Sequence, residues 1–494
     1  MRRTRLSLTL QRGRLAPAPA FMWALMIAVG LVACGPSSAG GRNILVITVD
    51  TTRADFVGAY GATLGVTPRL DALAEQGVVF ENAYAPMPQT LPSHATLFTG
   101  LEPRQHLALE NTYQLGSEFR TLAEVAQERG YNTGAFVGAL VLDQETGIQQ
   151  GFETFDIPAG LWNEARAGHP PQRSAEQVTE AALDWARDLD SDEPYLLWAH
   201  YYDPHADNAA GFEPPRRHRS QVNMKEVRKK VRRSASLAGS LSPDQRVEYW
   251  AQYAAEIRYT DEQVGRLLDG LAEEGLLDNT LVVVVGDHGE GLYEHGIKAH
   301  GVYLWEEMHR VPMIFVHPDG EFAGHRVAGR AALRDIEPTI KQLAMDIPSA
   351  GGDELGLDLW AHLPSTDGEA AREMPDRPIF LERPHFDRDR VRRRIVGVDL
   401  TKENAYGYLT AVLMGRHKLI RHPDGTTLRL YDLEADPQEM TDISASEPEL
   451  TARMAGLLEA WMEGYAVGAP GEGVEISDER RETLKALGYL GDGH

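Results

Sequence analysis

The stretch Asn-Ile-Leu-Val-Ile-Thr-Val-Asp, residues 43–50, decides the fold of this chain. Residues 43–49 form a nearly unbroken run of apolar and β-branched side chains, and Asp50 ends it. Strands that are buried on both faces show such continuous runs, and they occur in parallel sheets that helices cover. We therefore expect residues 43–49 to be a central strand, with Asp50 at its carboxyl end.

Further strands alternate with helices along the chain. The same apolar texture predicts strands at residues 132–139, 195–201, 281–285 and 312–316. Amphipathic spacing predicts helices at residues 68–77, 118–129, 176–189 and 247–268. This alternation predicts an α/β fold, in which a large central mostly parallel sheet carries helices on both faces. The predicted α/β domain spans residues 43–349.

The texture changes near residue 350. Shorter strand-like pieces at residues 409–414, 418–422 and 428–433 precede an amphipathic helix at residues 447–461. We expect residues 350–494 to form a smaller C-terminal α+β subdomain, an antiparallel sheet that carries one helix.

The first 34 residues have the features of a targeting segment. Several arginines precede an apolar run at residues 21–33, which is short for a membrane span and ends in small residues. The ending Leu-Val-Ala-Cys, residues 31–34, resembles the lipobox of bacterial lipoproteins. That resemblance implies lipidation at Cys34, a tether at residues 35–42, and a lipid-anchored protein in the bacterial cell envelope, periplasmic or surface-facing. An ordinary signal peptide or an uncleaved anchor is the alternative.

The charge balance limits the partners. Acidic residues outnumber Lys and Arg by 73 to 49, for a net charge of -24, which argues against nucleic-acid binding. A small anionic substrate remains compatible, because a bound divalent metal reverses the field locally. Residues 216–246 form a basic insertion, interpreted as an anion-steering patch, a contact with acidic head groups, or a solvated loop. Cys34 is the only cysteine, so no internal disulfide is expected.

Polar side chains gather where the predicted strands end. They are Asp50, Asp203, His205, Asp287 and His288. In open α/β sheets, ligands bind beyond the carboxyl ends of the strands. Aspartate oxygens and imidazole nitrogens suit zinc, manganese or calcium, so Asp50, Asp287 and His288 predict one divalent metal ion. The alternatives are that Asp50 caps a helix and that Asp287 and His288 belong to a polar turn.

The stretch at residues 88–100, Pro-Gln-Thr-Leu-Pro-Ser-His-Ala-Thr-Leu-Phe-Thr-Gly, contains a hydroxyl suited to this metal. Pro92 indicates a helix start, and Ser93 is expected as its N-cap. A hydroxyl at Thr90 then lies at the positive end of the helix dipole, where an alkoxide is stabilised. Thr90 is thus the predicted nucleophile and a fourth metal ligand, unless it only satisfies local backbone groups.

Several motifs together resemble the sulfatases of the alkaline phosphatase superfamily. They lie at residues 43–55, 67–71, 90–100, 286–296, 305–306, 310–312, 430–433 and 436–437. The resemblance implies that Asp50, Asp287 and His288 bind metal and that Thr90 occupies the nucleophile position. It also implies that Lys298 and His205 contact the sulfuryl or phosphoryl group and assist the leaving oxygen. His94, His300 and His106 match positions near the substrate.

The departures from that family are informative. Its motif Cys-x-Pro-Ser-Arg reads Thr90-Leu-Pro-Ser-His94 here, and threonine cannot become formylglycine. Thr51 replaces the second aspartate of a pair, and the Lys and His that usually follow the second strand are absent from residues 136–139. The ligand set therefore resembles the zinc or manganese sites of phosphodiesterases and phosphoethanolamine-type transferases in the superfamily.

The predicted function is a metal-dependent, sulfatase-like hydrolase that cleaves sulfate or phosphate-type esters through Thr90. The expected substrate is a small anionic ester or a sulfated or phosphorylated glycan or lipid. The alternatives are a phosphodiesterase or phosphonate monoester hydrolase, a head-group phosphotransferase at the membrane, and an inactive binding protein.

Overall fold

The computed structural model divides the chain into two units, Met1–Ala39 and Gly40–His494, and describes only the second. The described residues are 41–157, 173–190, 193–206, 212–234, 241–348, 356–364, 374–386, 407–465 and 477. The predicted signal peptide, its lipobox with Cys34, and the first part of the tether lie outside these residues. Among the described helices, none has the length and apolarity needed to cross a membrane.

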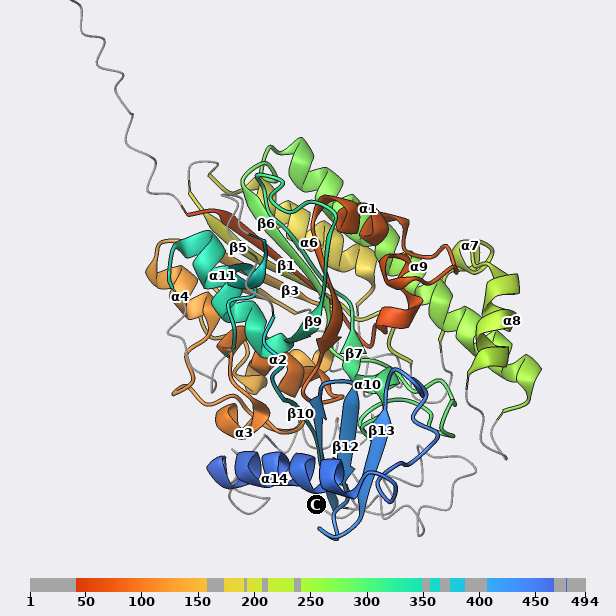
Figure 1. Ribbon diagram of the computed structural model, residues 1–494. Helices are drawn as coiled ribbons and strands as arrows, with labels where there is room; N and C mark the ends of the chain where they lie inside the picture. The colour runs from red at the N-terminus through yellow and green to blue at the C-terminus, as the bar shows by residue number, and fades with distance from the viewer. Residues whose placement is uncertain are drawn as a thin grey trace, which may run out of the picture. The chain divides into compact units, whose positions relative to one another are not determined.

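A large mixed sheet forms the centre of the described unit (Figure 1). Its strand order is β4-β3-β5-β1-β6-β8-β2-β7, and β9 pairs with β2. The parallel centre consists of β4 (Thr154–Asp156), β3 (Asn132–Val137), β5 (Tyr195–Tyr201), β1 (Asn43–Val49) and β6 (Thr280–Gly286). The other strands are β8 (Met313–Val316), β2 (Val78–Tyr84), β7 (Arg310–Val311) and β9 (His325–Ala332). β8 pairs antiparallel with β6 and β2, and β7 pairs antiparallel with β2.

Helices cover both faces of this sheet, as the alternation of elements predicted (Figure 1). Alternate side chains of β1 enter two separate cores. Ile44 and Val46 face the core of α2 (Thr90–Thr99), α4 (Leu122–Glu128) and α11 (Ile336–Met345). Leu45 and Ile47 face the core of α1 (Pro68–Gln76), α6 (Ala175–Arg187) and α9 (Pro243–Glu273). The predicted fold class is therefore confirmed.

A separate four-stranded antiparallel sheet follows near the C-terminus, blue in Figure 1. It consists of β10 (Ile379–Phe386), β11 (Gly407–Met414), β12 (His417–Arg421) and β13 (Leu428–Asp432), and α14 (Pro448–Gly464) packs on it. The rings of Phe380 and Trp461 stack with centroids 4.6 Å apart. The sequence predicted this sheet and its helix but not β10, and the domain boundary at residue 350 stays a prediction.

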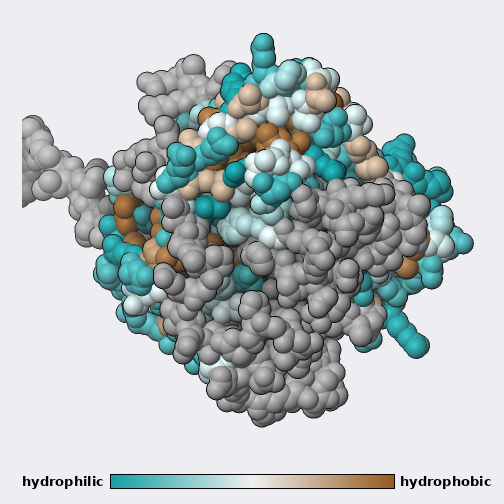
Figure 2. All heavy atoms as spheres, turned by 90° about the horizontal axis from the view of Figure 1, so that it is seen from below, coloured by the Kyte–Doolittle hydropathy of each residue, from teal (hydrophilic) through white to brown (hydrophobic). Residues whose placement is uncertain are grey.

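The described part of the basic segment is largely helical, where the solvated interpretation expected a loop. It contains α7 (Arg216–Arg219) and α8 (Met224–Arg233), and both contact α9. Val227 and Val231 are buried, which gives α8 an apolar side for this contact. In Figure 2, hydrophilic side chains predominate along the right-hand edge of the face, on the side where α7 and α8 lie in Figure 1.

Two helix starts differ from the predictions for local reasons. α9 begins four residues earlier than expected, because Ser242 and Gln245 form a capping box around Pro243 at the first turn. α2 begins at Thr90, with Gln89 as its N-cap, so Ser93 is not the cap. The Ser93 hydroxyl instead donates to the carbonyl of Met87, 2.9 Å away. Two short helices, α3 (Pro103–His106) and α10 (Glu306–His309), complete the set named here.

Candidate active site

The ends of β1 and β6 bring two aspartates together. Val49 pairs with Gly286, so Asp50 and Asp287 follow at neighbouring positions. One ligand atom each of Asp50, Asp287 and His288 lies within 4.8 Å of the others, and all three residues are buried. The register of two parallel strands thus produces the acidic group that the sequence predicted.

Backbone contacts orient Asp287. Its Oδ1 accepts hydrogen bonds from the backbone N–H of Thr51, at 3.0 Å, and of His288, at 2.7 Å. Its Oδ2 has no hydrogen-bond partner among the described residues, and the same holds for Asp50 Oδ1. Thr51 itself has a positive φ of 51°, a conformation that non-glycine residues seldom adopt. One oxygen of each carboxylate is therefore fully buried and still available to a ligand.

His288 presents one nitrogen to the same space. Its Nδ1–H donates to the carbonyl of Gly289 at 2.9 Å. In the neutral ring this leaves Nε2 unprotonated, the arrangement in which histidine binds a metal. Nε2 lies 3.5 Å from Thr90 Oγ1.

Thr90 completes the group from the other side. It is the first residue of α2, and its Oγ1 lies 3.4 Å from Asp50 Oδ2. The hydroxyl is buried within the first turn, where unpaired backbone N–H groups favour negative charge on an oxygen.

The residues fit a divalent cation. Burial and the neighbouring charge of Asp287 raise the pKa of Asp50, since two adjacent carboxylates are costly to ionise together. A bound cation removes that cost by neutralising both. Two carboxylates, an imidazole and a hydroxyl are donors that zinc and manganese accept.

A second layer of buried rings lies behind Thr90. His94 Nδ1 lies 2.7 Å from the Thr90 carbonyl, and His94 Nε2 lies 3.0 Å from Thr48 Oγ1. Thr48 Oγ1 is also 2.9 Å from His200 Nδ1 and accepts a hydrogen bond from the indole N–H of Trp198 at 2.9 Å. Burial lowers the pKa of His94 to about 3 and that of His200 to about 4. Both rings are therefore neutral near pH 7.

The structure places the other predicted site residues in different surroundings. The His300 ring lies 4.5 Å from the His288 ring and 5.0 Å from the His205 ring, measured between centroids. Lys298 is half-buried in the loop after β6, where its backbone forms an isolated antiparallel β-bridge with Leu292. His106 is fully buried, and its ring nitrogens contact Thr96 Oγ1 and the Ala108 N–H.

These surroundings suit the predicted contacts with a substrate for some of the histidines and not for others. The His300 ring lies next to the His288 ring, and the His205 ring lies next to that of His300, so their predicted roles near the substrate stay predictions that this arrangement allows. In His94 and His106, both ring nitrogens already form hydrogen bonds within the protein. These bonds do not favour direct contact with a substrate, which stays a prediction.

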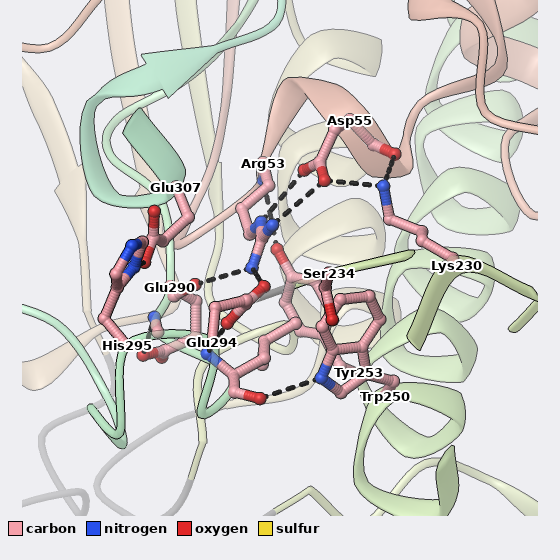
Figure 3. A network of polar contacts seen from close by, with 12 residues as sticks. Arg53, Asp55, Lys230, Ser234, Trp250, Tyr253, Glu290, Glu294, His295 and Glu307 are labelled. Carbon is pink, nitrogen blue, oxygen red and sulfur yellow. Dashed lines mark hydrogen bonds and ion pairs between the residues drawn. The ribbon is translucent and has the colours of Figure 1, made fainter. Parts of the chain in front are cut away.

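An ion-pair network supports the loops that carry the ligands (Figure 3). The Arg53 guanidinium holds Asp55 through two contacts of 2.9 Å, Glu294 at 2.5 Å and the Glu290 carbonyl at 3.1 Å. Lys230 of α8 reaches Asp55 at 2.6 Å. The network thus ties the loop after β1 to the loop after β6 and to the basic segment.

A cavity of about 480 Å³ opens beside this network. Arg53, Lys230 and Glu294 are among its lining residues, and none of the predicted catalytic or metal-binding residues is. The ligand atoms therefore converge outside this cavity, and the convergence of Asp50, Thr90, Asp287 and His288 defines the candidate site.

Sequence reasoning missed Thr48 and His200. Both lie inside predicted strands, where alternate residues normally belong to the core. Only the register that pairs Thr48 with His200, next to Asp50, reveals that they adjoin the site. Two polar residues inside otherwise apolar strands are the signal that was available.

The comparison with known families agrees with this geometry. The sulfatase family model matches residues 42–347, and the chain therefore belongs to the sulfatase family. It is a sulfatase-like ester hydrolase.

Relatives and solved structures extend the match over most of the chain. The N-acetylglucosamine-6-O-sulfatase of Bacteroides thetaiotaomicron is 23% identical over 87% of this chain and 88% of its own length. The structure of BT4656 in complex with its substrate, D-glucosamine-2-N,6-O-disulfate, has a TM-score of 0.69 at 20% identity, covering 87% of this chain and 99% of that one. The phosphonate monoester hydrolase of Agrobacterium radiobacter has a TM-score of 0.65 at 21% identity, covering 88% and 100%. These two likenesses concern the fold.

Proposed function

We propose that this chain hydrolyses sulfate or phosphate-type esters with Thr90 as the nucleophile at a divalent metal site. One observation carries the proposal: the Thr90 hydroxyl lies 3.4 Å from Asp50 Oδ2 and 3.5 Å from His288 Nε2. Among the residues that the structure describes, Asp50 Oδ1 and Asp287 Oδ2 have no hydrogen-bond partner. A hydroxyl at the start of a helix beside two buried carboxylates and an imidazole is an arrangement that suits a metal-assisted nucleophile.

Asp50, Asp287, His288 and Thr90 would hold the metal ion, with zinc or manganese preferred over calcium by the donor set. When bound, the ion supplies positive charge that favours the deprotonated hydroxyl and offsets charge on the substrate oxygens. Nucleophilic attack, proton donation and stabilisation of the remaining charge are assigned to side chains of the protein.

In the first step, Thr90 Oγ1 forms a bond to the sulfur or phosphorus while the bond to the leaving oxygen breaks in line with it. His205, beside His300, is the candidate donor of the proton that the leaving oxygen needs. Lys298 stabilises charge on the non-bridging oxygens. In the second step, water attacks the sulfur or phosphorus of the ester on Thr90, and the bond to Oγ1 breaks. A proton from that water restores the Thr90 hydroxyl, and the product is sulfate, phosphate or phosphonate according to the ester.

Threonine at position 90 bears on the choice of substrate. An aldehyde hydrate can expel sulfate by collapsing to the aldehyde, whereas a threonine ester must be hydrolysed at sulfur or phosphorus. This difference favours phosphate or phosphonate esters, as does the fold likeness to a phosphonate monoester hydrolase. The named relatives support a sulfated glycan as the second candidate.

The location of the enzyme is also a proposal. The lipobox at residues 31–34 supports attachment to the cell envelope through Cys34, so that substrates would be glycans or lipids met at a membrane face. An alcohol in place of water in the second step would make the protein a head-group transferase, the alternative to hydrolysis.

The test is a panel of aryl sulfate, aryl phosphate, phosphodiester and phosphonate esters, assayed with Zn²⁺, Mn²⁺ or Ca²⁺. Thr90→Ala is the informative variant, and Thr99→Ala is the control on the same helix. We expect Thr90→Ala to lose turnover and the control to keep it. Equal rates for Thr90→Ala and the parent would refute the nucleophile, and turnover of sulfate alone would refute the preference for phosphorus.

A further inference from the structure

The turn after β1 contains a residue in a costly backbone conformation. Thr51 is fully buried and has a φ of 51°, which is an outlier for a β-branched side chain. Such a conformation persists only where the surrounding structure holds it. The Thr51 N–H donates to Asp287 Oδ1 at 3.0 Å. The conformation of Thr51 and the orientation of a proposed metal ligand are therefore linked.

The hydroxyl of Tyr253, on α9, bridges the two ends of this turn. It donates to the Thr51 carbonyl at 2.6 Å and accepts from the Arg53 N–H at 3.0 Å. The direction of both hydrogen bonds is fixed, because a backbone N–H only donates and a carbonyl only accepts. One side-chain hydroxyl thus holds the backbone on both sides of Thr52.

Packing fixes the position of that hydroxyl. The Tyr253 ring is fully buried and meets Phe56 edge to face, with centroids 4.7 Å apart. Trp250, also on α9, donates its indole N–H to the Leu292 carbonyl at 2.8 Å. Figure 3 shows both rings beside the Arg53 network. Side chains of α9 therefore contact the loop after β1 and the loop after β6, which carry three of the four proposed metal ligands.

The turn also packs directly on the strand that leads into Asp287. A Cβ at Gly286 would lie 2.6 Å from the Thr52 carbonyl oxygen, closer than side-chain carbons come to backbone oxygens. Only glycine at this position lets the turn approach the end of β6 so closely. Movement of the turn would therefore be felt at Asp287.

We propose that Tyr253 is a positioning residue that holds Thr51 in its left-handed conformation and thereby orients Asp287. The inference rests on the proposed function for the identity of Asp287 as a metal ligand. Tyr253 anchors the carbonyl of Thr51, and Asp287 Oδ1 accepts from its N–H, so the two contacts together set the φ and ψ of this residue.

Loss of the Tyr253 hydroxyl would release one of the two anchors. Thr51 would then relax toward a favoured backbone region, and its N–H would turn away from Asp287 Oδ1. The carboxylate would lose the contact that leaves its Oδ2 without a protein partner among the described residues and available to a cation. Metal binding should weaken although no ligand has been changed.

The test uses Tyr253→Phe, which keeps the ring and removes the hydroxyl. Tyr249→Phe, one turn earlier on α9, is the matched control, because the Tyr249 hydroxyl has no hydrogen-bond partner among the described residues. A double variant combines Tyr253→Phe with Thr51→Gly. Glycine adopts a positive φ without steric cost, so this variant should not need the hydroxyl.

Two readouts avoid substrate altogether. Hydrogen–deuterium exchange of metal-free protein, followed by mass spectrometry of the peptide containing Thr51, reports whether the Thr51 amide stays protected. Competition titration gives the affinity for Zn²⁺ and Mn²⁺, and circular dichroism reports the fold.

We expect Tyr253→Phe to exchange the Thr51 amide faster and to bind metal about 10-fold more weakly, the lower end for residues that orient metal ligands. Tyr249→Phe should match the parent, and the double variant should recover most of the affinity.

Parent-like exchange at Thr51 in a folded Tyr253→Phe would overturn the proposal, and so would a loss of affinity that Thr51→Gly does not recover. If Tyr253→Phe alone fails to fold, a folded double variant supports the proposal and an unfolded one contradicts it. A parent that binds neither metal would refute the proposed function, whereas exchange at Thr51 in metal-free protein would still decide the role of Tyr253.

Discussion

Replacing Glu307 by Gln should destabilise the protein at pH 6 and have a much smaller effect near pH 10. The Glu307 carboxylate lies 2.6 Å from His295 Nδ1, in the network of Figure 3. His295 also contacts the Gln438 carbonyl through Nε2 at 2.8 Å and stacks on Trp305. The pair therefore joins the loop after β6 to the segment after β13.

The size of the effect follows from the pKa of His295. Burial alone would lower it, but Glu307, with smaller help from Glu439, outweighs burial and raises the pKa from 6.5 to about 9. Such a shift corresponds to about 3 kcal/mol between the two protonation states. Because the folded-state pKa is raised, this stabilisation is complete below pH 6.5 and is lost as the pH rises through about 9.

Urea unfolding followed by circular dichroism at pH 6 and pH 10 measures this difference. Glu459→Gln, at an exposed position of α14, is the matched control and should change the free energy of unfolding by less than about 0.5 kcal/mol. We expect Glu307→Gln to lose up to about 3 kcal/mol at pH 6. An equal loss at both pH values would refute the reasoning, because neutral His295 cannot form the ion pair.

Three further predictions concern other parts of the molecule. Asp50→Asn should abolish tight Zn²⁺ and Mn²⁺ binding in a titration, because a carboxylate ligand is lost. The protein should stay folded, because burial and then repulsion from Asp287 raise the pKa of Asp50, and a neutral amide avoids both costs. Trp461→Ala should lower the free energy of unfolding by about 3–5 kcal/mol in urea titrations, because it removes the ring stacked on Phe380. Cys34→Ser should shift the protein from the membrane to the soluble fraction of expressing cells; unchanged fractionation would contradict lipidation.

The central strands and their polar ends were predictable from local sequence. The continuous apolar run at residues 43–49 indicates a buried strand, and Asp50 follows its carboxyl end. Asp287 follows the carboxyl end of a second such strand, β6. By contrast, β2 carries Glu81 and Asn82 among apolar residues, and it was not predicted. It pairs with β8 and β9, which are distant in sequence, so its partners had to be known before its pattern could be interpreted.

The second layer of the site was beyond local sequence for a similar reason. His200 looks like an interior residue of a strand, and its position beside Asp50 depends on the register between β5 and β1. Likewise, Pro92 and Ser93 correctly indicated a helix, but the start at Thr90 depends on tertiary contacts such as the one between the Leu91 N–H and Asn111. Local sequence patterns predicted the proposed metal ligands, whereas the residues packed behind those ligands became evident only from the pairing between strands.

The most direct measurement of the central claim is the mass of the peptide containing Thr90 after acid quench during turnover of an aryl phosphate or aryl sulfate. The account predicts one added phosphoryl or sulfuryl group on Thr90 in the parent and none on this peptide in Thr90→Ala. An adduct on another residue, or full turnover by Thr90→Ala, would contradict it.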